Sequence, residues 1–359
     1  MSGADFPDCA LTYDIATSTL ILWVPYVEPR QVLWYGRTPT PEECLSRLDV
    51  DDVRYAPKMS RYISHTLSSS PCPVLYLLHP SHRPPLSPET ARGVRVDAAA
   101  LLPRMDAARV IKTKYEIAMI RRANSISSAA HRRVARKLLT FKNEREIEAV
   151  FRAECALRGA KNQAYAPIAG SGINAATLHY EDNDQELKGR ELVVVDAGCE
   201  FNVYASDVTR TLPINGKFSD QAGAIYGIVE KMQNECIAAV KPGLPFYKLH
   251  LHAAAVAVTG LLRLGVLRGG SAGEIFKAGT ISGFFPHGLG HHIGLETHDV
   301  SGSERLLVKG AEAGAGVKRT RREVVTAEDV KDFLPWAGPA PRGRQRLEKN
   351  MVVTIEPGM

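Results

Sequence analysis

The clearest pattern along the chain is a helical one. Hydrophobic residues recur every three or four positions over residues 114–138, which places them along one face of an α-helix. The positions are Ile117, Ile120, Ala123, Ile126, Ala130, Val134 and Leu138. We therefore predict a long amphipathic helix that begins near Lys114.

Three further helices are predicted from their boundaries. Asn143 and Glu146 have the spacing of a capping box, and Gly159 would end the helix that they begin. Another helix is expected over residues 219–240, up to a Pro-Gly pair, and an alanine-rich one over residues 249–267. Helical segments thus recur from residue 114 onward.

Short apolar runs predict the strands. In the first part of the chain they are residues 20–24 and 74–78, and a helix is expected to start between them at Thr40, where proline takes the first helical position. Later, residues 192–195 have the pattern of a buried strand, and residues 204–212 can pair back on it through a turn near Gly198.

Composition limits the class of protein. Of the 359 residues, 45% are hydrophobic and 23% charged, the balance of an ordinary globular protein, which excludes disordered, collagen-like and disulfide-scaffold chains. No apolar run reaches the ~18 residues needed to cross a bilayer, and the first residues lack a secretory signal pattern. The six cysteines form no C-x-x-C pair, so a reducing setting is expected, cytoplasmic or nuclear, and of the two we predict the cytoplasm.

Length and the change of pattern predict two domains. Short strands and turns occupy residues 1–108, expected to be a small α/β domain, and the helical pattern belongs to residues 109–359. Residues 301–349 hold 11 Lys and Arg against 7 Asp and Glu, most of the formal charge of +6. We expect a flexible insertion there. Its basic run, residues 318–322, lacks the interleaved aromatic residues of a nucleic-acid site, so no nucleic-acid partner is expected.

Histidine is concentrated in one short glycine-rich segment. Four of the chain's 11 histidines fall within 12 residues, namely His287, His291, His292 and His298. Imidazoles bind metals and transfer protons near neutral pH. This density therefore makes the segment a candidate for metal binding and proton handling.

Acidic residues stand at the ends of apolar runs. Asp196 follows the run at residues 193–195, and Asp207 comes eleven residues later. A carboxylate at the end of a buried strand is costly unless it is paired or bound to a cation, although Asp196 alone could simply cap a turn. Cys199 lies between them in the sequence and is expected to be a buried spectator thiol.

A third apolar run is also followed by a carboxylate. Residues 352–355 are predicted to form a strand that leads to Glu356, just before a Pro-Gly turn. Together with Asp196, Asp207 and His291, Glu356 makes an oxygen-rich set with one imidazole. Such a set suits Mn²⁺, Co²⁺ or Zn²⁺ in a two-metal hydrolase.

The order of these motifs is specific. Asp-x10-Asp, then His-Gly-Leu-Gly-His with His-Asp downstream, then Glu-Pro-Gly resembles the pita-bread metallopeptidases, and most of all the Xaa-Pro aminopeptidase and prolidase group. Residues 109–117 and 170–180 are similar to that group, and residues 5–9 are similar to its fungal members. The resemblance covers nearly the whole chain apart from residues 301–349. It implies an α+β fold, in which a pita-bread (creatinase/aminopeptidase) catalytic domain follows a smaller creatinase/prolidase-like α/β domain.

The resemblance also implies a metal centre with two Mn²⁺ ions per subunit, Co²⁺ or Zn²⁺ being alternatives. Asp196 would hold one metal and Asp207 would bridge both. His291 and Glu356 would complete the shell of the other metal. Glu356 would in addition accept and pass on the proton of the attacking water.

Further histidines would contact the substrate. The resemblance implies that His179 and His298 contact the scissile amide and stabilise its developing charges, and that His287 lines the pocket for proline. A packing or surface role is expected for His292. Supporting or structural roles are expected for Glu296 and Asp299.

The activity implied by the resemblance is release of an N-terminal residue from peptides with proline in second position, dipeptides included. Strict Xaa-Pro dipeptidase (prolidase) activity and a non-enzymatic pita-bread binding protein stay open as alternatives. A homodimer is expected by resemblance, and no membrane partner.

Both ends of the chain depart from the resemblance. The family carries a fifth ligand, a glutamate beyond the Glu-Pro-Gly strand, whereas this chain stops at Met359. Its first residues fall where the family is already inside the N-terminal domain. We therefore expect a fragment or incomplete gene model of a genuine enzyme, or a truncated chain, and the 359 residues alone are expected to be inactive or poorly folded.

Overall fold

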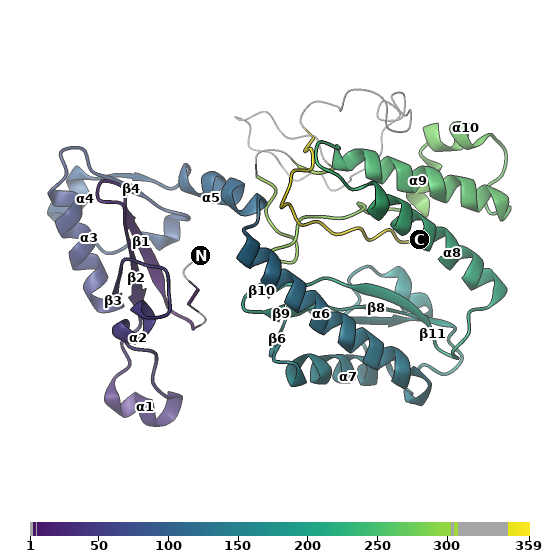
Figure 1. Cartoon of the computed structure of the whole chain (residues 1–359), viewed down its shortest axis with the longest axis horizontal. Coiled ribbons are helices and arrows are strands. Elements are labelled where there is room, and N and C mark those ends of the chain that lie inside the picture. Colours follow the sequence, from purple (N-terminus) through teal and green to yellow (C-terminus); the bar gives the residue numbers. More distant parts are fainter. Residues whose placement is uncertain (1–2, 5, 303–304, 308–343) are drawn as a thin grey trace. The chain divides into compact units, whose positions relative to one another are not determined.

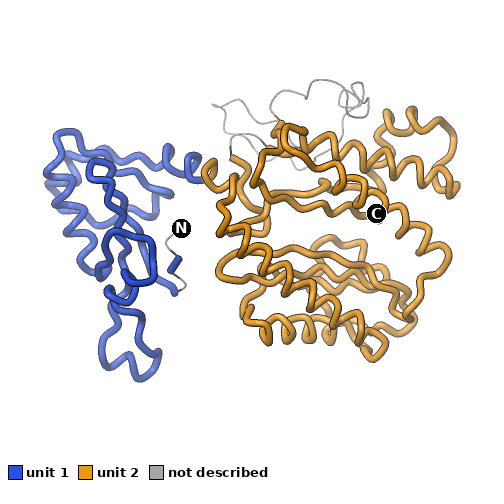
Figure 2. The backbone as a smooth tube through the Cα atoms, in the orientation of Figure 1, with its two compact units in different colours: residues 1–105 blue, residues 106–359 orange. Residues whose placement is uncertain are grey.

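The chain divides into two compact units. The computed structural model describes residues 3–4, 6–302, 305–307 and 344–359. Unit 1 spans residues 1–105 and unit 2 spans residues 106–359 (Figure 2). Helix α5 (Leu101–Val110) carries the chain from one to the other. The basic run at residues 318–322 and most of the expected insertion lie outside the described residues.

Unit 1 is built on a three-stranded sheet. Strand β1 (Ala10–Asp14) is antiparallel to β2 (Thr19–Val24), and β2 is parallel to β3 (Asp52–Tyr55) (Figure 1). The strand predicted at residues 20–24 and the helix start predicted at Thr40 are both confirmed. The helix start has a complete capping box. The helix that Thr40 caps is α2 (Pro41–Leu45). Unit 1 also contains a parallel pair of strands and further helices: β4 (Val74–Tyr76), β5 (Arg95–Asp97), α1 (Pro29–Tyr35), α3 (Met59–Ser68) and α4 (Pro88–Gly93).

Unit 2 opens with the two helices that the sequence predicts most clearly. Helix α6 (Lys114–Lys137) and helix α7 (Glu144–Leu157) each start at a capping box, with Thr113 and Asn143 as the capping residues. Ile126 and Phe151 are among the side chains that join the two helices to β8 in one hydrophobic core. The amphipathic face predicted for residues 114–138 is thus the face that is buried.

The predicted hairpin exists but has an excursion within it. Strand β8 (Leu192–Asp196) lies between β7 (Ile168–Ser171) and β11 (Thr209–Pro213), antiparallel to both. The chain between β8 and β11 forms β9 (Cys199–Phe201) and β10 (Tyr204–Ala205), which make a second small sheet with the earlier strand β6 (Asn162–Gln163). Its tight turn places two non-glycine residues at positive φ, Asn202 at 47° and Val203 at 63°.

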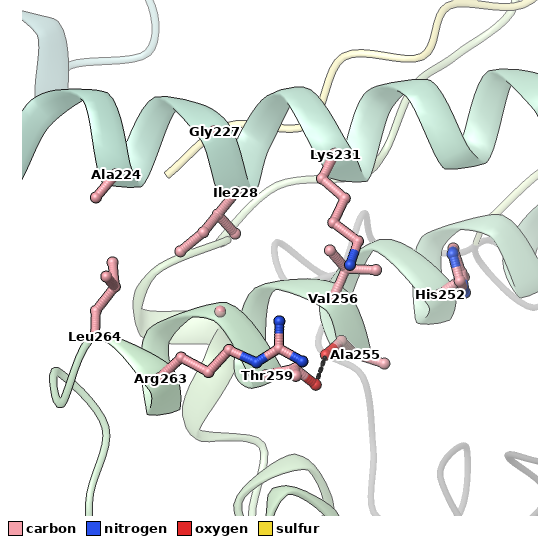
Figure 3. A pocket seen from close by; sticks show the side chains of 11 residues that line it. Ala224, Gly227, Ile228, Lys231, His252, Ala255, Val256, Thr259, Arg263 and Leu264 are labelled. Atoms are coloured by element: carbon pink, nitrogen blue, oxygen red, sulfur yellow. Dashed lines mark hydrogen bonds between the residues drawn. The ribbon is translucent and has the colours of Figure 1, made fainter.

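The second half of unit 2 is mostly helical. Helix α8 (Asp220–Ala239) is capped by Ser219, the first residue of the predicted span, whereas α9 (Phe246–Arg263) begins and ends earlier than predicted. Gly265 takes a left-handed φ of 70° just past the end of α9, which accounts for its earlier end. Between them lies a groove of about 440 Å³, lined by apolar residues such as Ile228 and Val256 (Figure 3). The other helices among the described residues are short: α10 (Ala272–Lys277), and the 3₁₀ turns η1 (Ala56–Lys58), η2 (Pro80–His82), η3 (Leu138–Thr140), η4 (Gly172–Ala176) and η5 (Thr280–Gly283).

The strand predicted over residues 352–355 is not a regular strand. The segment makes one isolated bridge, between His292 and Val353. Backbone hydrogen bonds nevertheless tie it to residues 289–293 at three points, from Ile293 N to Val352 O (3.2 Å), Thr354 N to His291 O (2.9 Å) and Glu356 N to Leu289 O (2.8 Å). The segment is therefore extended and held alongside residues 289–293, with Glu356 at its end.

A buried carboxylate organises the long connection after β7. Glu144, the first residue of α7, is fully buried. Its oxygens accept hydrogen bonds from Ser171 N (2.8 Å), Ser171 Oγ (2.5 Å), Tyr180 Oη (2.8 Å) and Gln185 N (3.0 Å). Burial alone would raise the pKa of Glu144, but these hydrogen bonds hold it below 4.5. One charge thus anchors the segment that contains His179.

This network predicts an acid-sensitive contribution to stability. A depressed folded-state pKa stabilises the fold above pH 4.5, and this contribution disappears as the pH falls through the folded pKa. At pH 7 the variant Glu144→Gln should lose about 3 kcal/mol of unfolding free energy. Urea unfolding at pH 7 and pH 3 should show the gap between wild type and variant closing in acid. An equal gap at both pH values would contradict this account.

Candidate metal centre

Three segments that are distant in the sequence bring their ionisable side chains together. Asp207 lies between β10 and β11, His291 lies in the glycine-rich segment, and Glu356 ends the extended segment. One ligand atom from each lies within 4.8 Å of the others. His291 Nε2 is 3.2 Å from Asp207 Oδ2 and 3.1 Å from Glu356 Oε1.

Two glycines make the close approach of these segments sterically feasible. A Cβ on Gly198 would lie 1.8 Å from Ser206 O, and a Cβ on Gly290 would lie 2.1 Å from Thr354 O. Both distances are far below van der Waals contact, so any other residue would push the segments apart. Gly198 thereby brings the residues before Asp207 against the end of β8, and Gly290 brings Glu356 to His291.

The orientation of His291 is set by its backbone. Its Nδ1 lies 2.8 Å from His292 O, to which it would donate, and that leaves Nε2 with its lone pair facing the two carboxylates. Nε2 is buried and has no well-aligned hydrogen bond. Burial alone would lower the pKa of His291, but Asp207 and Glu356 raise it to about 10. A buried imidazole nitrogen aimed at two carboxylates is the donor set of a divalent cation, which fits these residues.

Asp196 joins the centre through a tyrosine. It ends β8 opposite Thr209, and Tyr165 Oη lies 2.5 Å from Asp196 Oδ1 and 2.9 Å from Asp207 Oδ1. Burial, with the nearby charges of Asp207 and Glu356, raises the pKa of Asp196 to about 6. The same burial and the two carboxylates raise the pKa of Tyr165 well above its usual value. Tyr165 is thus a neutral hydrogen-bond donor to both aspartates.

Two of the three substrate-side histidines lie close to this cluster. The ring of His298 stands edge-on to His291, with 4.3 Å between ring centroids, and burial followed by the charge of His291 lowers the pKa of His298. His179 is exposed, and its charge acts in the same direction on His298. His287 packs edge-on to Phe285 at 5.0 Å.

His287 also lies beside the Glu-Pro-Gly turn. Its Nε2 would be 2.8 Å from a Cβ added at Gly358, so the missing side chain there makes room for the ring. The structure therefore places His287 next to the segment of Glu356.

The supporting residues also have defined places. His292 is buried and its Nε2 lies 2.6 Å from Gln345 Oε1, so it packs inside and not at the surface. Glu296 and Asp299 both bind Arg109, at 2.8 Å and 2.5 Å. Cys199 is buried, as expected, and its hydrogen bond with Cys155 lowers the pKa of Cys199.

Two residues of the centre were not found from the sequence. Tyr165 stands in an irregular stretch with no motif around it. Thr354 accepts from His291 N (2.9 Å) and donates to Glu356 Oε1 (3.0 Å), so it connects two candidate ligands. The polar residue inside the apolar run at residues 352–355 was the available signal for Thr354.

A half-buried set of carboxylates and imidazole on an α+β scaffold defines a metal-dependent hydrolase. Residues 118–359 match the metallopeptidase family M24, and residues 1–76 match the aminopeptidase P N-terminal domain. The chain belongs to metallopeptidase family M24. The resemblance and the fold class expected from the sequence are thereby confirmed, and the protein is a metalloenzyme of this family with divalent metal as its cofactor.

Relatives and solved structures agree with this assignment. The chain is 55% identical to a probable Xaa-Pro aminopeptidase of Colletotrichum graminicola and 50% identical to one of Metarhizium acridum, covering all of this chain and 70% and 71% of those proteins. The low-pH form of Escherichia coli aminopeptidase P is 27% identical, with a TM-score of 0.77 over 99% of this chain and 76% of that one. A zinc-substituted product complex of the same enzyme gives a TM-score of 0.75 at 26% identity. Within the described part of the chain, no helix has the length and hydropathy to cross a bilayer.

Removal of the tyrosine hydroxyl tests its part in the metal centre. Tyr165→Phe takes a hydrogen bond from both aspartates, and outer partners of metal ligands typically contribute 10- to 100-fold to metal affinity. We expect titration calorimetry with Mn²⁺ to show at least about a 10-fold weaker Kd. Tyr13→Phe, at an exposed position in unit 1, is the matched control. Equal affinity of Tyr165→Phe and the control would rule out this role.

Proposed function

We propose that this metalloenzyme is an Xaa-Pro aminopeptidase. It releases the N-terminal residue from peptides whose second residue is proline, with a pair of Mn²⁺ ions as the cofactor. The names of its relatives support aminopeptidase activity over strict dipeptidase activity. Asp196, Asp207, His291 and Glu356 are the proposed ligands.

One observation carries the proposal. His291 Nε2 faces Asp207 and Glu356 at 3.2 Å and 3.1 Å, while Nδ1 is occupied by a backbone carbonyl. A neutral imidazole would present a lone pair to two anions in this position, which is unfavourable without a cation between them. The donor set therefore supports metal binding more strongly than any motif alone.

The bound metal supplies a nucleophilic water at neutral pH and polarises the peptide carbonyl. Glu356 is placed to take up the proton of that water, because its Oε1 is oriented by the Thr354 hydroxyl. Tyr165 keeps Asp196 and Asp207 in fixed positions through its hydroxyl. These side chains orient the ligands and move the proton.

The histidines have the chemistry that the substrate requires. Burial keeps the pKa of His298 below 6.5, so its ring is neutral at pH 7 and can donate one N–H to a developing oxyanion. His179, which is exposed, is proposed to contact the peptide beside it. His287 is proposed to line the proline pocket, where Phe285 packs against its ring.

The chemistry of the bond before proline explains why a peptidase needs such a site. The bond before proline is a tertiary amide with no N–H, so a peptidase cannot hold it through a main-chain donor. A histidine that donates to the carbonyl, beside a bound metal that would polarise it, would replace that contact. We also propose peptides as the partners, a homodimer as the assembly and the cytoplasm as the location.

The activity is tested with matched peptides and matched variants. With Mn²⁺ a protein extended by the glutamate strand that the resemblance implies should release the first residue from a tripeptide with proline second. It should leave the same peptide with alanine second intact. His291→Ala removes a ligand and should lower kcat at least about 100-fold, beyond the usual effect of an outer partner. His82→Ala, an exposed histidine in unit 1, should have no effect.

Two results would contradict the proposal. One is an absence of turnover with every divalent metal tested while metal binds. The other is equal activity of His291→Ala and His82→Ala.

A further inference from the structure

A buried ion pair lies beside the metal centre and has no part in the proposed chemistry. Lys112 Nζ is 2.8 Å from Asp299 Oδ2, and both side chains are 1% exposed. Arg109 Nη2 is 2.5 Å from the other oxygen, Asp299 Oδ1. Lysine is almost never fully buried, so the pair calls for an explanation.

The pair connects the two segments that carry His291 and Glu356. Lys112 N donates to Asn350 O at 2.9 Å, at the start of the segment that ends with Glu356, and Asn350 has a left-handed φ of 71°. Asp299 N donates to His292 O at 2.9 Å, which closes the loop that follows His291. Asp299 is also the residue immediately after His298.

The backbone of Gly294 lies close against the Asp299 carboxylate. A Cβ on Gly294 would lie 2.3 Å from Asp299 Oδ2 and 3.0 Å from Lys112 Cε. The glycine backbone thus covers the ion pair, and neither group can move toward it. Since His298 is covalently next to Asp299, the place of its ring against His291 depends on where this carboxylate is held.

Stability alone is a weak explanation of this pair. Breaking a buried ion pair is costly, but replacing it with well-packed apolar residues is often neutral or stabilising. The ion pairs also fix the orientation of the Asp299 carboxylate, because one cation holds each of its two oxygens, at 2.8 Å and 2.5 Å. Apolar residues cannot provide that constraint.

We propose that Lys112 and Asp299 are positioning residues that hold the ring of His298 at the metal centre. The proposal rests on the proposed function, because it assigns His298 a place in catalysis. Lys112 acts through Asp299, with which it is paired. Its removal should therefore loosen His298 while the ligands stay in place.

The first test is a double-mutant cycle on the metal-loaded protein. Lys112→Met keeps the length of the side chain and should lower kcat about 10- to 100-fold with little change in KM. In a His298→Ala background the same substitution should change kcat less than 2-fold, because the residue it acts through is gone. Lys231→Met, which removes the exposed partner of Glu235 at 3.7 Å, is the matched control and should be neutral. An equal loss of kcat in both backgrounds would overturn the proposal.

The second test does not depend on turnover. The His298 ring signal in a ¹³C-histidine NMR spectrum, assigned from its loss in His298→Ala, should shift or broaden in Lys112→Met and stay in place in Lys231→Met. An unmoved His298 signal would overturn the proposal whether or not the protein is active. An inactive wild type with a shifted signal would count against the proposed function and support the positioning role.

A milder variant covers the case in which Lys112→Met does not fold. Arg109→Met removes the more exposed cation and leaves the Lys112–Asp299 pair intact. It should move the His298 signal in the same direction by a smaller amount. A folded Arg109→Met with an unchanged His298 signal would then overturn the proposal.

Discussion

The structure of unit 2 depends on one electrostatic constraint, which is the crowding of carboxylates around a single imidazole nitrogen. Asp207 and Glu356 both lie within 3.2 Å of His291 Nε2, and Asp196 is linked to Asp207 by one tyrosine hydroxyl. Like charges this close cannot all be ionised in a half-buried site without a cation. Burial with the charges of Asp207 and Glu356 raises the pKa of Asp196 to about 6, and the two carboxylates raise that of His291 to about 10, as expected where a positive charge is missing.

The fold satisfies this constraint by joining segments that lie far apart in the sequence. Gly198 and Gly290 permit backbone contacts that no side chain would allow. Thr354 ties His291 to Glu356, and Glu144 anchors the connection that carries His179. The buried pair of Lys112 and Asp299 adds a support on the side of His298. Each of these contacts lies outside the donor set and fixes its geometry.

Local signals predicted much of this arrangement. The periodicity of residues 114–138, the helix start at Thr40 and the capping box at Asn143 predicted helices at the correct positions, because these signals depend only on neighbouring residues. The candidate ligands could be chosen because acidic residues at the ends of apolar runs need a partner. The roles assigned to individual site residues stay proposals.

What could not be predicted depends on distant partners. Residues 352–355 read as a strand but form only an isolated bridge, since regularity depends on which segments pair with them. The β9–β10 excursion and the hydrogen bonds of Tyr165 likewise depend on contacts made in three dimensions. Lys112 could be seen in the sequence as part of a family resemblance, but nothing local marked it as buried.

Proton release on metal binding tests the central claim most directly. In the metal-free protein His291 should be protonated at pH 8, because its pKa is raised to about 10, and a metal ligand must be neutral. Calorimetric titration with Mn²⁺ at pH 8, in buffers of different ionisation enthalpy, should therefore show release of about one proton. His291→Ala should abolish this release. Metal binding without proton release, or with the same release in His291→Ala, would contradict the assignment of this cluster as the metal centre.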